Sequence, residues 1–180
     1  MNITVYCGGS AGVSQHYLAA ASELGRLLAR AGVTLVYGGA SSGMMGALAK
    51  AALAEGGKVV GVYPEFMRLH EPLLAGITET IIVATMAERK AKLAELADGF
   101  MILPGGIGTM EEFFEIYSAR KLGLHQKPIV IVNTKAYWNP LLDLLDQIAD
   151  HGFTTEASID LCHWCESSNE GLQVIVERLK

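Results

Sequence analysis

Short apolar segments alternate with longer amphipathic segments along almost the whole chain. The short segments are rich in branched and aromatic residues and are apolar at every position, which is typical of β-strands covered on both faces. The longer segments carry apolar residues at helical spacing. Alternating buried strands and helices predict a doubly wound α/β fold, in which a parallel sheet forms the middle layer of a three-layer α/β/α sandwich.

The pattern places six strands and six helices. The predicted strands are Ile3–Cys7, Thr34–Tyr37, Lys58–Val62, Thr80–Val83, Phe100–Leu103 and Ile129–Val132. The predicted helices are Gln15–Arg30, Met44–Ala54, Met86–Leu96, Thr109–Leu122, Pro140–His151 and Glu170–Leu179. The least regular stretch is Pro64–Gly76. No internal repeat or linker divides the sequence, so we expect residues 1–180 to form a single domain.

Charge and hydropathy exclude several classes of function. The formal net charge is -5, so the chain lacks the basic field that generic nucleic-acid binding requires. No apolar run approaches the roughly 18 to 20 residues that span a bilayer, and no signal peptide opens the chain. We therefore expect a cytoplasmic protein with neither nucleic-acid nor membrane partners.

Three cysteines, Cys7, Cys162 and Cys165, are present. An odd number in a chain without a signal peptide argues against a disulfide framework. The last two have C-x-x-C spacing, but a structural zinc site needs four ligands and no second pair exists. Nor does the pair precede an obvious helix, as a thioredoxin-type motif does. The sequence predicts no metal site.

Three glycine-rich turns follow predicted strands, at Gly8–Gly12, Gly38–Gly43 and Pro104–Gly108. Ligands of doubly wound folds bind beyond the carboxyl ends of the strands, where these turns gather. Each turn opens a helix, and unpaired N–H groups at a helix start bind anions. Ordinary turn chemistry explains one such turn, but three at one edge favour a phosphate site.

The spacing within the turns limits the kind of phosphate compound. The first two turns lack the G-x-G-x-x-G spacing of dinucleotide-binding proteins, and no P-loop lysine follows any of the three. The remaining candidates are mononucleotides, sugar phosphates and similar anions.

Charged residues follow two of the predicted strands. Glu112 comes three residues after Thr109, which is the spacing of a helix capping box, and on spacing alone this structural explanation is the simpler one. Arg89 and Lys90 lie near the start of another predicted helix, where the helix dipole disfavours cations. Because this unfavourable placement falls at the ligand edge, it indicates a binding role for the basic pair.

Taken together, the two segments resemble a known family. The stretch "PGGIGTMEE" matches the pattern P-G-G-x-G-T-x-x-E, and "MAERK" upstream matches the R-K element of the Lonely Guy family of cytokinin riboside 5′-monophosphate phosphoribohydrolases. The stretches "VYGGASSGMMGALAKAAL" and "KLGLHQKPIVIVN" extend the resemblance over most of the chain. It implies a Rossmann-like fold, a homodimer, no cofactor, and cleavage of the N-glycosidic bond of AMP-type nucleotides, including N6-modified cytokinin nucleotides, to free base and ribose 5-phosphate.

The resemblance also implies roles for individual residues. Arg89 and Glu112 fall on the catalytic pair of the family. The positions that fall on nucleotide contacts are Glu71, Lys90, Gly105, Gly106, Ile107, Gly108, Thr109 and Ser118. The chain departs from the family at Ala87, where histidine is usual, and at Gly38-Gly39-Ala40, where three glycines are usual.

Cleavage of a glycosidic bond builds positive charge on the ribose, which a carboxylate at Glu112 can stabilise while it orients water. Arg89 can keep that carboxylate ionised. A non-catalytic nucleotide or cofactor carrier would use the same glycine-rich loops without needing the acid. Many bacterial relatives carry a lysine decarboxylase label, but nothing beyond the phosphate loop points to a pyridoxal phosphate enzyme.

Overall fold

The computed structural model describes residues 1–69 and 72–180. Within them, one seven-stranded sheet has the order β4-β3-β2-β1-β5-β6-β7, and every neighbouring pair is parallel. The strands are β1 (Asn2–Tyr6), β2 (Thr34–Tyr37), β3 (Val59–Pro64), β4 (Glu79–Val83), β5 (Gly99–Ile102), β6 (Ile129–Val132) and β7 (Cys162–Cys165). The prediction of a doubly wound α/β fold is confirmed.

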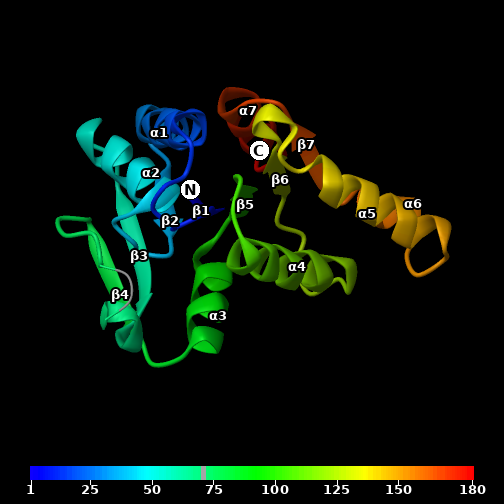
Figure 1. Cartoon of the computed structure of the whole chain (residues 1–180), viewed down its shortest axis with the longest axis horizontal. Helices are drawn as coiled ribbons and strands as arrows, with labels where there is room; N and C mark the ends of the chain where they lie inside the picture. Colours follow the sequence, from blue (N-terminus) through cyan, green and yellow to red (C-terminus); the bar gives the residue numbers. More distant parts are fainter. Residues whose placement is uncertain (70–71) are drawn as a thin grey trace.

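Helices cover both faces of the sheet (Figure 1). The helices α1 (Gln15–Arg30), α2 (Gly43–Ala54) and α7 (Ser168–Arg178) pack on one face. The helices α3 (Met86–Leu96), α4 (Ile107–Lys121) and α5 (Asn139–Asp150) pack on the other. The shorter elements are α6 (Glu156–Ile159) and the 3₁₀ turns η1 (Glu65–Leu69) and η2 (Thr134–Ala136).

The strands separate two hydrophobic cores because successive side chains of a strand point to opposite faces. In β1, Val5 belongs to the core under α1, α2 and α7, whereas Tyr6 belongs to the core under α3, α4 and α5. The central strands β5 and β6 are buried along their whole length. This two-sided burial explains why the strands are apolar at every position.

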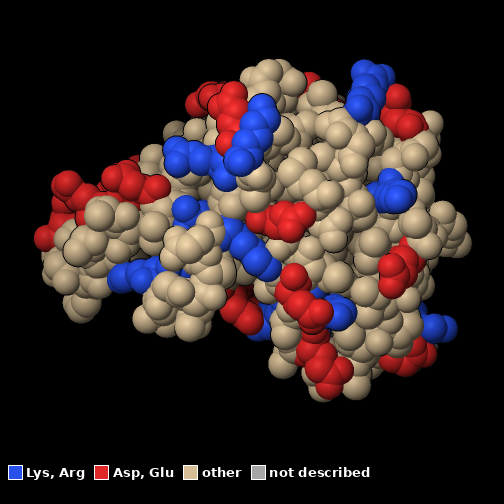
Figure 2. Space-filling model, turned by 180° about the vertical axis from the view of Figure 1, so that it is seen from behind, with Lys and Arg blue, Asp and Glu red and all other residues tan. Residues whose placement is uncertain are grey.

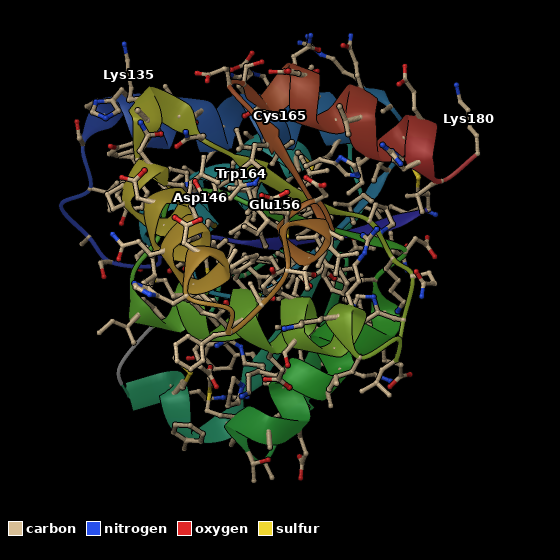
Figure 3. The ribbon with its side chains drawn as sticks, turned by 90° about the vertical axis from the view of Figure 1, so that its right-hand side faces the viewer. Lys135, Asp146, Glu156, Trp164, Cys165 and Lys180 are labelled. Carbon is tan, nitrogen blue, oxygen red and sulfur yellow. The ribbon has the colours of Figure 1, made fainter. Side chains whose placement is uncertain are left out.

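Strand β7 was not predicted from the sequence. It is an edge strand, paired with β6 in the described part of the sheet, and its four residues, Cys-His-Trp-Cys, lack the continuous apolar run of the central strands. Figure 3 shows it with Trp164 and Cys165 labelled. Cys162 and Cys165 lie in different cores, on opposite faces of the sheet, and both are free thiols. The C-x-x-C pair therefore cannot close a disulfide or share a metal ion.

Two helices begin with the hydrogen bonds of a capping box. The Thr85 hydroxyl oxygen accepts a bond from the Glu88 amide before α3, and the Ser167 hydroxyl oxygen accepts one from the Glu170 amide before α7. In both cases a glutamate side chain also reaches back to a backbone amide just before the helix. These bonds determine where the two helices begin.

The order of the strands places a ligand crevice between β1 and β5. The chain passes from β1 through β2 and β3 to β4, and β5 then returns to the other side of β1. In doubly wound folds, ligands bind at this reversal, beyond the carboxyl ends of the strands. The loops that leave the two strands are joined there, since the Gly8 amide donates to the Pro104 carbonyl at 3.1 Å.

The surface agrees with the charge composition. On the face shown in Figure 2, basic and acidic side chains are interspersed, and the described residues form no extended basic area there. Across residues 1–69 and 72–180, no helix is both long and apolar enough to cross a membrane.

Candidate active site

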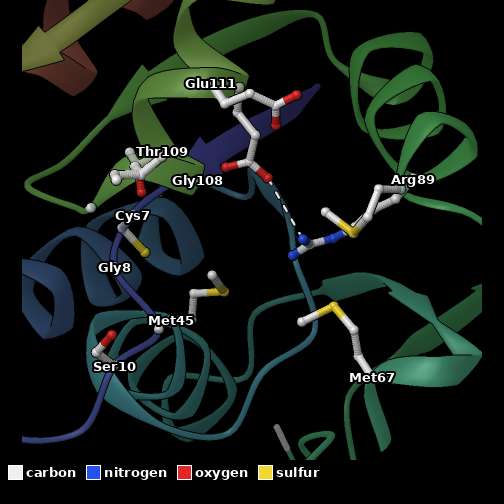
Figure 4. A pocket seen from close by; sticks show the side chains of 14 residues that line it. Cys7, Gly8, Ser10, Met45, Met67, Arg89, Gly108, Thr109 and Glu111 are labelled. Carbon is white, nitrogen blue, oxygen red and sulfur yellow. Dashed lines mark ion pairs between the residues drawn. The ribbon is translucent and has the colours of Figure 1, made fainter. Parts of the chain in front are cut away.

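A cavity of about 300 Å³ opens at the carboxyl ends of β1 and β5 (Figure 4). Its lining comes from the loop after β1 and from α2, η1, α3 and α4. The site residues expected from the sequence that line this cavity are Arg89, Gly106, Ile107, Gly108, Thr109 and Glu112. The fold thus brings together the two segments that the sequence separates.

The floor of the cavity is the N-terminus of α4. Gly106 caps the helix, and within the described residues the amides of Ile107, Gly108 and Thr109 have no hydrogen-bond partner. Side chains added at Gly106 and Gly108 would meet open space, so glycine leaves this backbone bare. Three free N–H groups at the positive end of a helix form an anion site.

The loop before α4 is held rigidly. A Cβ atom at Gly105 would collide with the side chain of Thr109, so this turn accepts only glycine. The hydroxyl of Tyr137 donates to the Gly105 carbonyl at 2.6 Å. The Thr109 side chain is buried beneath the loop and helps to shape it.

We expected all three glycine-rich turns to open helices with free amides, but at the start of α2 the amides are already bonded. The amides of Met44 and Met45 both donate to the Gly8 carbonyl, and the Ser42 hydroxyl donates to the Gly9 carbonyl. The turn at Gly38–Gly43 therefore supports the loop after β1 and leaves little of the α2 N-terminus for an anion. The free amides suited to an anion are therefore those at the start of α4.

The capping-box interpretation of Glu112 is wrong. Helix α4 begins at Ile107, two residues earlier than predicted, so Thr109 and Glu112 both lie inside the helix. Glu112 is only 6% exposed and faces the cavity instead of the helix terminus. A buried carboxylate that does not cap a helix requires another explanation.

Arg89 is the partner of Glu112. Its Nη1 lies 3.8 Å from Glu112 Oε1, the pair drawn with a dashed line in Figure 4. The two remaining guanidinium nitrogens donate to backbone carbonyls, Nε to Val62 at 3.3 Å and Nη2 to Gly38 at 3.2 Å. Arg89 is only 4% exposed, and these three contacts determine the orientation of its guanidinium.

Gly38 makes this anchoring of Arg89 possible. A Cβ atom at this position would overlap the Arg89 guanidinium and press on the Met45 sulfur. The first glycine of the second turn therefore makes room for the arginine and accepts its hydrogen bond. Ala40 stands where the family usually has a third glycine in this turn. It is fully buried, and the hydrogen bond from Arg89 to the Gly38 carbonyl is present despite the substitution.

Burial dominates the ionisation of Glu112. Desolvation raises the pKa of this carboxyl to about 7, against a lowering by Arg89, which is the next largest effect. Glu111 and Glu115 raise the pKa further and Lys90 lowers it. Glu112 therefore changes its charge near neutral pH, as general bases and charge-stabilising carboxylates commonly do.

Three methionines that the sequence did not single out complete the cavity. Met45, Met67 and Met86 come from α2, η1 and α3, and Figure 4 shows the sulfurs of Met45 and Met67 facing the cavity opposite the α4 N-terminus. Their thioethers make this end of the cavity apolar and adaptable. No local sequence signal marks them, because they come from three separate elements.

Cys7 also lines the cavity, where its thiol is buried and is expected to stay protonated. Burial, and next the charge of Glu112, raise the pKa of its thiol well above the usual range. A protonated thiol is a weak nucleophile.

Four of the expected substrate contacts lie outside the described cavity lining, and one of them is Gly105, in the loop before α4. Lys90 forms ion pairs with Glu111 and Glu115 and is not part of the cavity lining. Ser118 is exposed on α4, also away from the lining. Glu71 falls outside the described residues.

The family model described as "Possible lysine decarboxylase" matches residues 45–175 of the chain. A cytokinin riboside 5′-monophosphate phosphoribohydrolase from Rhodococcoides fascians is 48% identical over 158 residues, which cover 87% of this chain and 80% of that protein. A probable cytokinin riboside 5′-monophosphate phosphoribohydrolase from Oryza sativa subsp. japonica is 44% identical over 151 residues, which cover 84% of this chain and 68% of that protein.

Among solved structures, the molybdenum cofactor binding protein of the phototrophic bacterium Rippkaea orientalis superposes with a TM-score of 0.77. The match covers 99% of this chain and 97% of that one at 20% identity. At this identity the likeness extends to the fold alone.

Proposed function

The chain belongs to the Lonely Guy family of cytokinin riboside 5′-monophosphate phosphoribohydrolases, and on this premise we propose that it hydrolyses the N-glycosidic bond of AMP-type nucleoside 5′-monophosphates. The products are the free base and ribose 5-phosphate. The observation that carries the proposal is the buried Arg89–Glu112 pair, which faces the free N-terminus of α4 across a single cavity.

The cavity accommodates a nucleotide in one orientation, with the phosphate at the start of α4 and the base at the methionines. The 5′-phosphate binds the amides of Ile107, Gly108 and Thr109, and the ribose then lies beside Glu112. Because phosphate and base project from opposite ends of a ribose, the base extends past Glu112 toward the methionines. An apolar, deformable base site suits adenine and its N6-alkylated derivatives.

The reaction consumes a water molecule, and it requires that positive charge on the ribose be stabilised and that the departing base gain a proton. As the bond from C1′ to the base nitrogen breaks, its electron pair leaves with the base and positive charge develops on the ribose. Ionised Glu112 stabilises that charge and orients the water that attacks C1′. The water loses a proton as its oxygen bonds to C1′, and the departing base gains one. Arg89 orients Glu112 and favours its charged form against the effect of burial.

A direct assay tests this function. Incubation of the protein with AMP should release adenine and ribose 5-phosphate, which chromatography separates from the nucleotide. Adenosine serves as the control, because binding of the remote phosphate positions the ribose, so the nucleoside should react poorly. Tight binding of AMP without any release of adenine would instead identify a carrier.

The carrier alternative receives less support from the molecule. A carrier needs the α4 anion site but has no use for a buried carboxylate whose ionisation costs desolvation energy. Decarboxylation is also disfavoured, since no lysine lines the part of the cavity that the structure describes. Pyridoxal phosphate chemistry requires a lysine within reach of the cofactor.

The ionisation of Glu112 predicts the pH dependence of the reaction. Because only the carboxylate stabilises the developing charge, kcat/KM for AMP should rise with pH and level off above the pKa of about 7. The second ionisation of the nucleotide phosphate, near pH 6, falls on the same rising limb and steepens its lower part. A pH series of initial rates from pH 5 to 9 measures it. A constant kcat/KM between pH 5 and 8 would contradict the role of Glu112.

We also propose a homodimer that uses the outer face of α4. Leu122 and Leu124, just beyond its C-terminal end, are 71% and 75% exposed, and a second copy would cover them. Light scattering at micromolar concentration should give twice the mass of the chain, and a monomer mass contradicts the dimer.

The remaining features of the proposal follow from the fold. One sheet runs through the chain, which supports residues 1–180 acting as a single catalytic domain. All three cysteines are free thiols, which supports a reducing, cytoplasmic location.

A further inference from the structure

The peptide group that joins Gly105 to Gly106 lies immediately before α4, where the anion site begins. Its carbonyl, that of Gly105, accepts the hydrogen bond from the Tyr137 hydroxyl at 2.6 Å. Its N–H, that of Gly106, has no hydrogen-bond partner among the residues that the structure describes. The carbonyl and the N–H of a trans peptide point in opposite directions, so the Gly106 amide points away from Tyr137.

Gly106 lies between two cavities. One is the candidate active site, and the other has a volume of about 270 Å³ and is lined by Tyr137 and Gly105. Gly106 lines both, whereas residues 107–109 line only the active site. An amide of Gly106 that points away from Tyr137 therefore leaves the second cavity and joins the free amides of residues 107–109.

The chain on either side of this peptide does little to fix its orientation. Both Gly105 and Gly106 lack a Cβ atom, and glycine adopts positive φ as readily as negative φ. Rotation of the peptide plane by half a turn would give Gly106 a positive φ in place of the observed −94°. It would also turn a carbonyl oxygen toward the phosphate and the N–H away. The rotated form loses the hydrogen bond from Tyr137, so this bond favours the observed orientation.

An unusual turn places Tyr137 beside the loop. Lys135 and Ala136, which precede it, have φ values of 57° and 56°, a left-handed conformation that is strained for residues with a Cβ atom. The Lys135 side chain points outward from the protein, so no contact of its own explains this geometry (Figure 3). The turn is closed by Asn133, whose side-chain oxygen accepts a bond from the Trp138 amide at 2.7 Å. The strained turn is thus held by its neighbours, with Tyr137 directed at Gly105.

We propose that Tyr137 is a positioning residue whose hydroxyl orients the Gly105–Gly106 peptide, so that the Gly106 amide becomes a fourth donor to the phosphate. The hydroxyl acts from the far side of the loop and does not touch the nucleotide. Successive backbone amides that converge on one point form a strong anion site. This inference rests on the proposed function for the identity of the phosphate compound.

Removal of the hydroxyl alone tests the proposal. Tyr137→Phe retains the ring and should weaken the binding of ribose 5-phosphate, measured by calorimetry, about fivefold to tenfold. Tyr17→Phe is the matched control, because Tyr17 lines the same second cavity and packs against Tyr137 with ring centroids 5.5 Å apart. Its hydroxyl has no hydrogen-bond partner in the described ranges, so this variant should bind within about twofold of the wild type. Binding by Tyr137→Phe that is no weaker than by Tyr17→Phe overturns the proposal.

A double-variant comparison tests whether the hydroxyl acts through the peptide. Gly106→Ala suits the observed negative φ and its methyl group meets open space, but alanine resists the positive φ of the rotated peptide. In the Gly106→Ala background, Tyr137→Phe should therefore weaken ribose 5-phosphate binding by less than about twofold. A loss as large as in the wild-type background would show that the hydroxyl acts by another route, and the proposal would fail.

Kinetics give a readout that a general loss of structure would not reproduce. A phosphate contact made equally before and during the reaction changes KM and leaves kcat, so Tyr137→Phe should raise KM for AMP and keep kcat within about twofold. A lower kcat at unchanged KM would indicate displacement of Glu112 and would contradict the proposal.

The binding and kinetic measurements distinguish failure of this inference from failure of the proposed function. Binding of ribose 5-phosphate does not require hydrolysis. If the wild type binds this product but releases no adenine from AMP, the hydrolase function fails while the binding comparison still tests Tyr137. If the wild type hydrolyses AMP and Tyr137→Phe binds as the control does, only the inference about Tyr137 fails.

Discussion

Glu112→Gln is expected to lower the turnover of AMP about a hundredfold or more, because the charge that faces the developing cation is lost. Glutamine has nearly the same shape, so the cavity and the packing of α4 are retained. Release of adenine under saturating AMP measures the effect. Glu95→Gln is a matched control, since Glu95 is an exposed glutamate of α3 whose carboxylate pairs, among the residues that the structure describes, with Lys92 alone. Turnover of Glu112→Gln within a few-fold of the wild type would refute the catalytic assignment.

The stability of the same variant should change in the opposite direction. Burial raises the pKa of Glu112 from 4.5 to about 7, so the protonated form stabilises the fold below pH 4.5. That contribution is lost as the pH rises through 7. Glutamine is neutral at every pH, and Glu112→Gln should therefore melt at a higher temperature than the wild type at pH 8. The difference should be small at pH 5. A variant less stable than the wild type at pH 8 would indicate that the carboxylate serves the fold.

Arg89→Ala is expected to reduce turnover by a comparable factor. Without the guanidinium, nothing opposes the desolvation that favours protonated Glu112, and the carboxylate also loses the group that orients it. The Val62 and Gly38 carbonyls lose their donor as well, so some stability should be lost. Turnover and melting temperature are measured together. If Arg89 and Glu112 act as a unit, the double variant should be scarcely slower than either single one.

Gly38→Ala offers a second route to the same loss, with the arginine retained. The added methyl group occupies the place of the guanidinium, so Arg89 must leave Glu112, and turnover should fall about tenfold or more. In the Arg89→Ala background the methyl group enters vacated space, and Gly38→Ala should then cost little further. Equal losses in both backgrounds would show that Gly38 acts by some means other than Arg89.

Much of the fold could be predicted because the relevant signals are local. The runs that became β2 and β6 were predicted with the observed limits, and so were α1 and α3, since strand and helix periodicities act over a few residues. Strand β7 was missed because an edge strand need not be apolar on both faces. The glycine-rich turns met at one edge of the sheet, as the order of strands and helices required.

The site could be predicted in part. The resemblance to the family placed Arg89 and Glu112 together, and the structure puts their charged groups 3.8 Å apart. Spacing alone favoured the wrong account of Glu112, because Thr109 and a glutamate three residues later satisfy a capping box wherever the helix happens to begin. Helix α4 begins at Ile107, so Glu112 lies inside the helix and faces the cavity instead of capping the helix.

By itself, the sequence of this protein determined the alternation of strands and helices, the edge at which ligands bind, and the loop that leaves amides free for phosphate. Only the tertiary structure decided the charge state and the partners of the ionisable groups. Arg89 is anchored by the Gly38 carbonyl, 51 positions away in the chain, and Lys90 is held by glutamates of another helix. The physical reason is that desolvation and Coulomb energies depend on the groups that surround a charge in space, and no local pattern specifies them.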